Sequence, residues 1–337
     1  GAPWSGARGR SSIVRSHMLI SASVRTDIPA FYAEWFRNRL AAGYCRYVNP
    51  YNTLQQPRVS LRPADVDGFV FWTKNLAPFL PVLEEVRQRE MPFMVQYTIN
   101  GYPRELESRV VDAEASVRTL QQLAERYHPR VAVWRYDTIV LSSLTPFAWH
   151  VENFGRLASQ LKGATDEVVV SFVQMYKKTR TNIAAAEKEH AFQLYAADAE
   201  IAQALLRQLA PIAADNGMQM VLCAQPELQV AGVGVAHCVD KSRMEGLADK
   251  TIAAKIDGTR DKCECYKSRD IGEYDTCPHG CVYCYAVQNR PLALARYKAH
   301  NPMSDFLFEP AAITPLPEEQ AAGTQQLDLF SSHDRHH

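Results

Sequence analysis

The sequence lacks a net charge, a long apolar run and a secretory signal. Its 37 Lys and Arg residues balance 37 Asp and Glu residues. No global basic field therefore attracts polyanions, and nucleic-acid affinity requires a local patch or a recruiting partner. No run of about 18 consecutive apolar residues is present, so no membrane span is expected. Residues 1–17 are basic and serine-rich without an apolar core, which predicts a vector-derived leader and a cytoplasmic protein.

The chain has the composition of a protein that buries a full core. Of its 337 residues, 47% are hydrophobic and 22% are charged, which excludes a mostly disordered chain. Short apolar runs alternate with longer stretches of helical spacing. The runs cover residues 18–24, 68–72, 93–97, 131–136, 168–173 and 218–223. This alternation predicts an α/β fold with a parallel sheet covered by helices.

Each apolar run ends in polar or charged residues. In an α/β barrel the carboxyl ends of the strands form the rim of the active site. Such a rim would gather Arg25, Asp27, Lys74, Asn100, Arg135, Asp137 and Gln174 around one pocket. For any single one of these residues, an ordinary helix cap or loop position is the alternative.

Eight cysteines carry the strongest chemical signal. They are Cys45, Cys223, Cys238, Cys263, Cys265, Cys277, Cys281 and Cys284. Five of them lie between positions 263 and 284. A clustered set in a large chain without a signal peptide favours metal or iron–sulfur ligation over disulfides.

Three of these cysteines form a C-x3-C-x2-C motif at Cys277, Cys281 and Cys284. Three thiolates on one tight loop can hold three corners of a cubane cluster. Gly280 lets the backbone turn close to an inorganic core. Three ligands leave one iron open to a substrate or cofactor. The alternative is a zinc knuckle with His279 as the fourth ligand.

This motif resembles the signature of radical S-adenosylmethionine enzymes, with aromatic Tyr283 before the third cysteine. The resemblance implies a 4Fe–4S cluster on the three cysteines, S-adenosylmethionine on the open iron and Tyr283 beside its adenine. It also implies a 5′-deoxyadenosyl radical, an electron donor such as flavodoxin or ferredoxin, and an open six-stranded barrel. Asn100, Arg135 and Asp137 are candidates for the cofactor's polar groups, whereas Arg25, Asp27 and Lys74 would face substrate. The motif departs from the usual family pattern because it follows the sixth strand instead of the first.

Over about residues 18–310 the chain resembles the DUF1848 family. The resemblance is carried by Ser23–Pro29, Phe71–Asn75, Trp134–Asp137, Asp270–Tyr274 and the cysteine motif. The family label supplies no reaction. The layout is more distantly similar to spore photoproduct lyase. The expected organisation is a leader (1–17), a partial (β/α)6 TIM-like barrel (18–230), a cysteine-rich iron–sulfur segment on the barrel mouth (231–309) and a disordered tail (310–337).

Cys223, Cys238, Cys263 and Cys265 together can supply a second site, for zinc or for an iron–sulfur cluster. Basic neighbours of Cys263 and Cys265 favour their thiolate forms. Alternatively, Cys223 is a small buried hydrophobic residue.

The tail contains the peptide Gln326-Leu327-Asp328-Leu329-Phe330. It resembles the peptide by which bacterial polymerases and repair proteins bind the sliding clamp. Leu329 and Phe330 would fill an apolar pocket while Gln326 fixes the register. The alternative is an apolar end that packs back on its own domain.

These signals favour a radical S-adenosylmethionine-type enzyme that acts on nucleic acid, in DNA repair or modification, after recruitment by the clamp. Two other readings stay open. One is a non-enzymatic zinc protein that binds DNA or the clamp. The other is a radical enzyme that acts on a metabolite or peptide.

Overall fold

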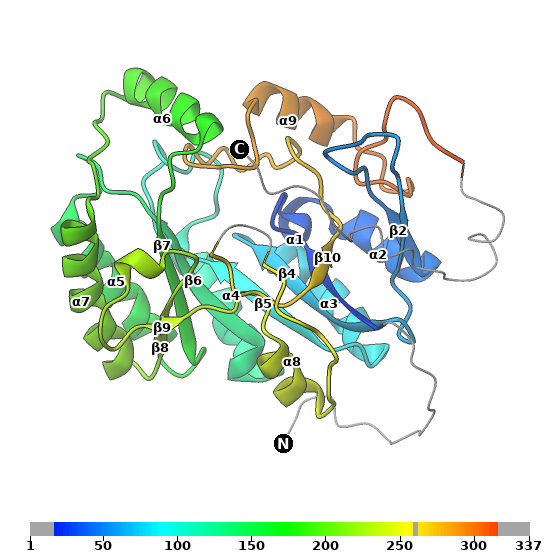
Figure 1. Ribbon diagram of the computed structural model, residues 1–337, viewed down its shortest axis with the longest axis horizontal. Coiled ribbons are helices and arrows are strands. Elements are labelled where there is room, and N and C mark those ends of the chain that lie inside the picture. The colour runs from blue at the N-terminus through cyan, green and yellow to red at the C-terminus, as the bar shows by residue number, and fades with distance from the viewer. Residues whose placement is uncertain (1–16, 259–261, 316–337) are drawn as a thin grey trace.

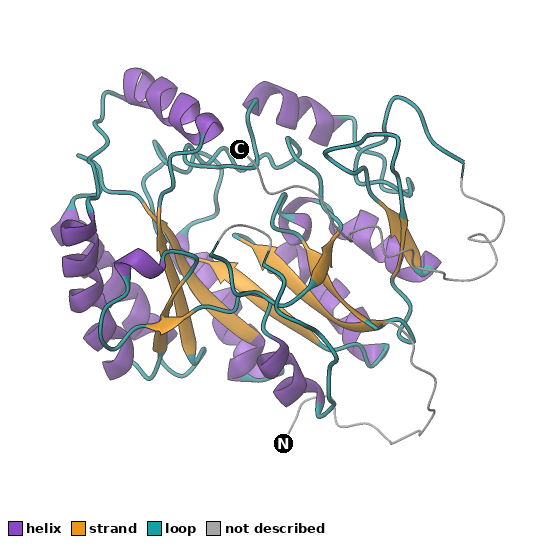
Figure 2. Cartoon of the chain, viewed as in Figure 1, coloured by secondary structure: helices purple, strands orange, loops and turns teal. Residues whose placement is uncertain are grey.

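The computed structural model describes residues 17–258 and 262–315, and this part of the chain is built around one parallel sheet (Figures 1 and 2). Its eight strands are ordered β10-β1-β4-β5-β6-β7-β8-β9. Their bounds are β1 Met18–Ala22, β4 Val66–Thr73, β5 Phe93–Thr98, β6 Ala132–Ile139, β7 Glu167–Phe172, β8 Gln219–Leu222, β9 Gly234–Val235 and β10 Ser268–Asp270. Every neighbouring pair in this order is parallel.

The α/β class and the six predicted apolar strands are confirmed. They correspond to β1 and β4–β8, which lie side by side in chain order. Their residues are almost all buried, as in β5 and β7. A parallel strand covered on both faces has no solvent-facing side, so its sequence is apolar at nearly every position instead of alternating.

The helices cover the sheet and its ends. They are α1 Ile28–Phe31, α2 Ala33–Ala42, α3 Leu80–Gln88, α4 Ala113–Arg126, α5 Phe147–Leu161, α6 Lys177–His190, α7 Ala199–Asp215, α8 Lys241–Ala248 and α9 Arg290–Lys298, with 3-10 turns η1 Ala77–Phe79, η2 Pro129–Val131 and η3 Pro226–Leu228. Helices α4 and α7 pack on β6 and β8, and α5 lies against both helices. In Figure 1, α6 and α9 lie above the sheet and α8 at its lower front.

The segment after residue 230 does not form a separate layer. It supplies both edge strands, because β9 pairs with β8 and β10 pairs with β1. Within the described residues β9 and β10 do not pair with each other, so the sheet has two edges. The cysteine-rich segment is thus part of the sheet that it was expected only to cover.

The antiparallel hairpin of β2 (Tyr44–Arg46) and β3 (Arg58–Ser60) holds the last described residues. Gln56 donates to Ala312 O at 2.7 Å, and Arg46 donates to Thr314 O at 2.7 Å. The chain is therefore still hydrogen-bonded to the hairpin at Ala312 and Thr314, although the disordered tail was expected to begin at residue 310. The predicted leader, apart from His17, and the peptide Gln326–Phe330 lie outside the described residues. None of the described helices has the length and apolarity to cross a membrane.

Candidate functional site

The cysteine motif lies at the carboxyl edge of the sheet, against the residues that follow β5. Glu107 and Cys281 form an antiparallel bridge. Val282 N donates to Leu106 O at 3.0 Å, and Arg109 N donates to His279 O at 3.1 Å. A loop that follows the sixth predicted strand therefore reaches the same edge as the ends of β4 and β5.

Gly280 permits this docking. Its φ of +75° lies in the left-handed region that favours glycine. A Cβ on Gly280 would lie 2.4 Å from Ser108 Oγ. Both the backbone conformation and the close approach therefore require a residue without a side chain between Cys277 and Cys281.

The three motif thiols lie within electrostatic reach of one another. Cys284 and Cys277 raise the pKa of Cys281 through their charge, and Cys284 raises the pKa of Cys277 in the same way. Burial is the largest cause that raises the pKa of Cys277, to about 12, and it also raises that of Cys281. Their thiolate forms therefore need a nearby cation. No group of three or more His, Cys, Asp or Glu side chains within residues 17–258 and 262–315 stands ready to hold a metal ion.

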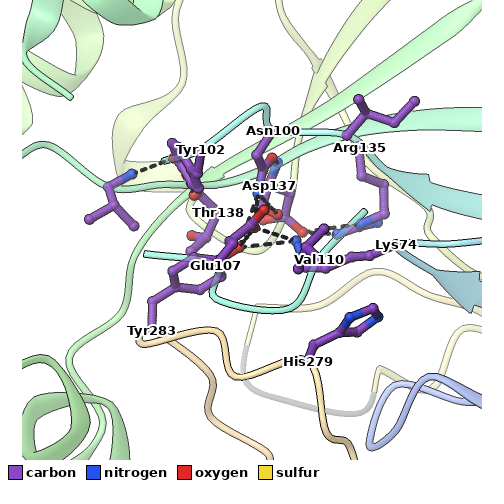
Figure 3. A network of polar contacts seen from close by, with 12 residues as sticks. Lys74, Asn100, Tyr102, Glu107, Val110, Arg135, Asp137, Thr138, His279 and Tyr283 are labelled. Carbon is purple, nitrogen blue, oxygen red and sulfur yellow. Dashed lines mark hydrogen bonds and ion pairs between the residues drawn. The ribbon is translucent and has the colours of Figure 1, made fainter. Parts of the chain in front are cut away.

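A buried polar network supports the motif (Figure 3). Lys74 Nζ lies 2.8 Å from Glu107 Oε1 and 3.0 Å from the Tyr283 hydroxyl. Asn100 Nδ2 donates to Glu107 Oε1 at 3.2 Å and to Tyr283 at 3.1 Å, and Tyr283 donates to Glu107. Burial alone would lower the pKa of Lys74, but Glu107 and Cys281 raise it. Burial alone would raise the pKa of Glu107, but Lys74 lowers it.

Asp27 joins the end of β1 to the cysteine motif. One carboxylate oxygen caps α1 through Ala30 N at 2.9 Å. The other oxygen accepts from Lys74 N at 2.7 Å and lies 2.7 Å from His279 Nε2. With both oxygens engaged, Asp27 positions the motif loop. The contact with substrate that was expected of Asp27 stays a prediction.

Arg25 lies nearer to β10 than to this network. Its Nε is 3.9 Å from Asp270 Oδ1, its Nη1 donates to Gly272 O at 3.4 Å, and its guanidinium lies over the Tyr274 ring. Asp270 also accepts from Ser21, Ser23 and Val24. The predicted substrate residues Arg25 and Lys74 are therefore both at the carboxyl edge, but they belong to different polar groups.

Arg135 contacts a cysteine outside the motif. Its Nη1 donates to Gln96 Oε1 at 3.1 Å and to Cys238 Sγ at 3.0 Å, while other nitrogens pair with Asp137. Burial would lower the pKa of Arg135, but Cys238 and Asp137 raise it well above its ordinary value. Asp137 N donates to Asn100 Oδ1 at 3.0 Å, which connects Arg135 to the Glu107 network. Of the predicted cofactor residues, Asn100 and Tyr283 therefore contact each other directly. Asp137 is bonded to Asn100, and Arg135 is connected to it through Asp137.

Within the described residues, three buried polar atoms on the motif or on segments near it have no hydrogen-bond partner. They are Thr26 Oγ1, His279 Nδ1 and Arg290 Nη2. Arg290 also lies within electrostatic reach of Cys284. Buried polar atoms are almost always paired, so this group suits a polar ligand at the motif. Thiolate donors and a nearby cationic donor together fit a thiolate-ligated cluster with a bound polar cofactor.

Glu107 also lines a pocket of about 190 Å³, together with Asn100, Tyr102, Arg104, Glu114 and Arg156 among others. It is smaller than the roughly 300–1,000 Å³ that usually holds a drug-sized ligand. It therefore suits a small polar group better than a whole nucleoside cofactor.

Glu107 and Asp270 are site residues that the sequence reasoning missed. Glu107 lies in a loop with Glu105 close by, and no spacing separates the two. Only the bridge to Cys281 distinguishes it. Asp270 lies in Asp270–Tyr274, one of the stretches that resemble the DUF1848 family. That resemblance pointed to the residue but implied no role for it.

Residues 19–286 match the family described as Domain of unknown function (DUF1848). The chain belongs to the DUF1848 family. The match includes the strands β1 and β4–β10, the Glu107 network and all three motif cysteines. No curated protein and no solved structure matches the chain.

Proposed function

We propose that this DUF1848 chain is a radical S-adenosylmethionine-type enzyme whose cluster is held by Cys277, Cys281 and Cys284. The observation that carries the proposal is the docking of the motif loop, through Glu107 and Val282, onto the carboxyl edge of a parallel sheet. Ligand sites in parallel α/β sheets lie at this edge. A 4Fe–4S cluster with S-adenosylmethionine supplies, on one-electron reduction, cleavage of the cofactor to methionine and a 5′-deoxyadenosyl radical.

The chain's own residues have distinct tasks in this proposal. Lys74 brings a positive charge toward Cys281, which favours the thiolate ligand. Glu107 holds the Lys74 ammonium, and with Asn100 it fixes the Tyr283 hydroxyl. Arg290 Nη2 and Thr26 Oγ1 offer unpaired polar atoms to the cofactor. Arg25 stays the candidate for substrate.

We also propose that the sheet is the wall of a partial barrel. Its six central strands are parallel, sequentially ordered and joined by crossovers that contain helices. This order is the one found in (β/α) barrels. A partial barrel would leave a lateral opening for a large substrate.

Nucleic acid as substrate and the sliding clamp as partner rest on Gln326–Phe330 alone. Binding of this peptide to the clamp would raise the local concentration of an enzyme that has no excess of basic residues. An electron donor of the flavodoxin or ferredoxin type completes the proposal, since the chemistry consumes one electron.

The test is anaerobic reconstitution with iron and sulfide, followed by reduction with dithionite in the presence of S-adenosylmethionine. The proposal expects a reduced-cluster electron paramagnetic resonance signal and release of 5′-deoxyadenosine. Cys281→Ala should abolish both, whereas Cys45→Ala is the matched control because Cys45 is a buried thiol outside the motif. Zinc without iron at the motif, or a full cluster that yields no 5′-deoxyadenosine, would overturn the proposal.

A further inference from the structure

Four thiols outside the proposed cluster motif gather from three separate segments. Cys223 follows β8, Cys238 follows β9, and Cys263 and Cys265 precede β10. The sulfur atoms of Cys223 and Cys238 are 3.5 Å apart. The Cys265 thiol lies within electrostatic reach of those of Cys238 and Cys263. The four side chains therefore form one continuous chain of thiols.

These thiols are withdrawn from solvent. Cys223, Cys238 and Cys265 are 3%, 2% and 5% exposed, and Cys263 is partly buried. The buried guanidinium of Arg135 donates to Cys238 Sγ at 3.0 Å. A buried cation that donates to sulfur stabilises a thiolate, and such outer partners are typical of metal–thiolate sites.

The spacing of the sulfurs favours a single metal ion over a cubane. With zinc–sulfur bonds of about 2.3 Å, the sulfurs of a tetrahedral site lie about 3.8 Å apart. The 3.5 Å between Cys223 and Cys238 is close to that edge. Thiolates at two corners of a cubane are held further apart, because the inorganic core lies between them.

We propose that Cys223, Cys238, Cys263 and Cys265 bind one zinc ion as four thiolates in a closed structural site. Binding releases four thiol protons to solvent and forms four zinc–sulfur bonds, with no change in oxidation state. No metal-holding group is ready-formed in the described residues. The side chains must therefore turn from this chain of thiols onto a common centre, as is usual when metal binding completes a fold.

The zinc site would crosslink the two ends of the segment that runs from one edge strand, β9, to the other, β10. Cys223 and Cys238 lie at the β8–β9 edge, whereas Cys263 and Cys265 lead into β10 at the opposite edge. Tyr266 N already donates to Val239 O at 3.1 Å, which joins the chain next to Cys265 to the chain next to Cys238. A metal here stabilises β10 and with it Asp270, the partner of Arg25.

The experiment measures zinc, iron and sulfide in full-length protein purified without oxygen from zinc-supplemented medium. One zinc per chain is expected in the wild type, in Cys45→Ala, and in the triple variant Cys277→Ala/Cys281→Ala/Cys284→Ala. Cys263→Ser, at the most exposed of the four cysteines, should lower zinc affinity at least about 100-fold, because loss of even an outer-shell partner costs about 10–100-fold. Cobalt(II) in the triple variant should give the absorption bands of tetrahedral four-thiolate coordination, which tests the ligand set without a variant at the site.

Several outcomes would overturn the zinc site. They are iron and sulfide in place of zinc in the triple variant, full zinc affinity in Cys263→Ser, and a Cys223–Cys238 disulfide in the anaerobic wild type. Cobalt absorption bands that indicate fewer than four thiolate ligands would also overturn the zinc site. Because the triple variant lacks the proposed cluster ligands, zinc binding there is independent of whether the enzymatic proposal holds.

Discussion

The buried ion pair of Lys74 and Glu107 should make Glu107→Gln strongly destabilising. The Lys74 side chain is 14% exposed and that of Glu107 is 4% exposed, so water screens their charges poorly. Removal of one partner from a buried pair costs about 3–5 kcal/mol, because the remaining charge stays buried without compensation. We expect about 3 kcal/mol, the lower end, since Lys74 keeps Tyr283 as a partner.

The effects of substitutions at Lys74 and Glu107 should be strongly coupled. Lys74→Met/Glu107→Gln removes both charges, so most of the lost stability should return. A double-mutant cycle should therefore give a coupling energy of about 2 kcal/mol. In Glu107→Gln alone, the pKa of Lys74 should fall, because burial then acts without the opposing carboxylate.

Urea unfolding at neutral pH, followed by circular dichroism, measures these free energies. The matched control is Glu85→Gln, which breaks the exposed 2.7 Å pair with Arg37 and should cost at most about 1 kcal/mol. Additive single-variant effects, or a Glu107→Gln loss no larger than that of Glu85→Gln, would refute the argument.

Three further predictions concern pH, the motif turn and the α1 cap. Burial lowers the pKa of His150 from 6.5 to about 4. Between pH 6.5 and about 4, His150 is therefore protonated in the unfolded chain but neutral in the folded protein. About 3 kcal/mol of folding stability should be lost as the pH falls through this range. Gly280→Ala should cost about 1–3 kcal/mol and reduce iron loading, with part recovered by adding Ser108→Ala, which removes the 2.4 Å contact. Asp27→Ala should cost about 2 kcal/mol by removing the cap and the His279 partner, whereas Asp27→Asn keeps the cap and should cost about half as much.

Each of these predictions has a simple contradiction. The stability of His150→Gln should depend less on pH between 6.5 and 4 than that of the wild type, and an unchanged slope would contradict the assignment. Iron loading of Gly280→Ala equal to the wild type would show that the turn is not required. Equal losses in Asp27→Ala and Asp27→Asn would show that capping contributes nothing.

Local sequence pattern is enough to predict the α/β class and the six central strands. Strands buried on both faces must be apolar at nearly every position, and that local pattern is legible without tertiary contacts. The motif Cys277, Cys281 and Cys284 is equally local, since all three thiols lie on one loop.

Long-range contacts, in contrast, determine which distant residues surround that loop. Glu107 became a site residue through a backbone bridge to Cys281, and no local pattern separates it from Glu105. The short edge strands β9 and β10 have too few residues to show a period, and their place depends on pairing with β8 and β1. Arg135 ends its strand like other polar residues there, yet its guanidinium lies on Cys238 because packing turns it toward that sulfur. Local sequence fixes backbone periodicity, whereas the partner of a buried charge is chosen by the whole fold.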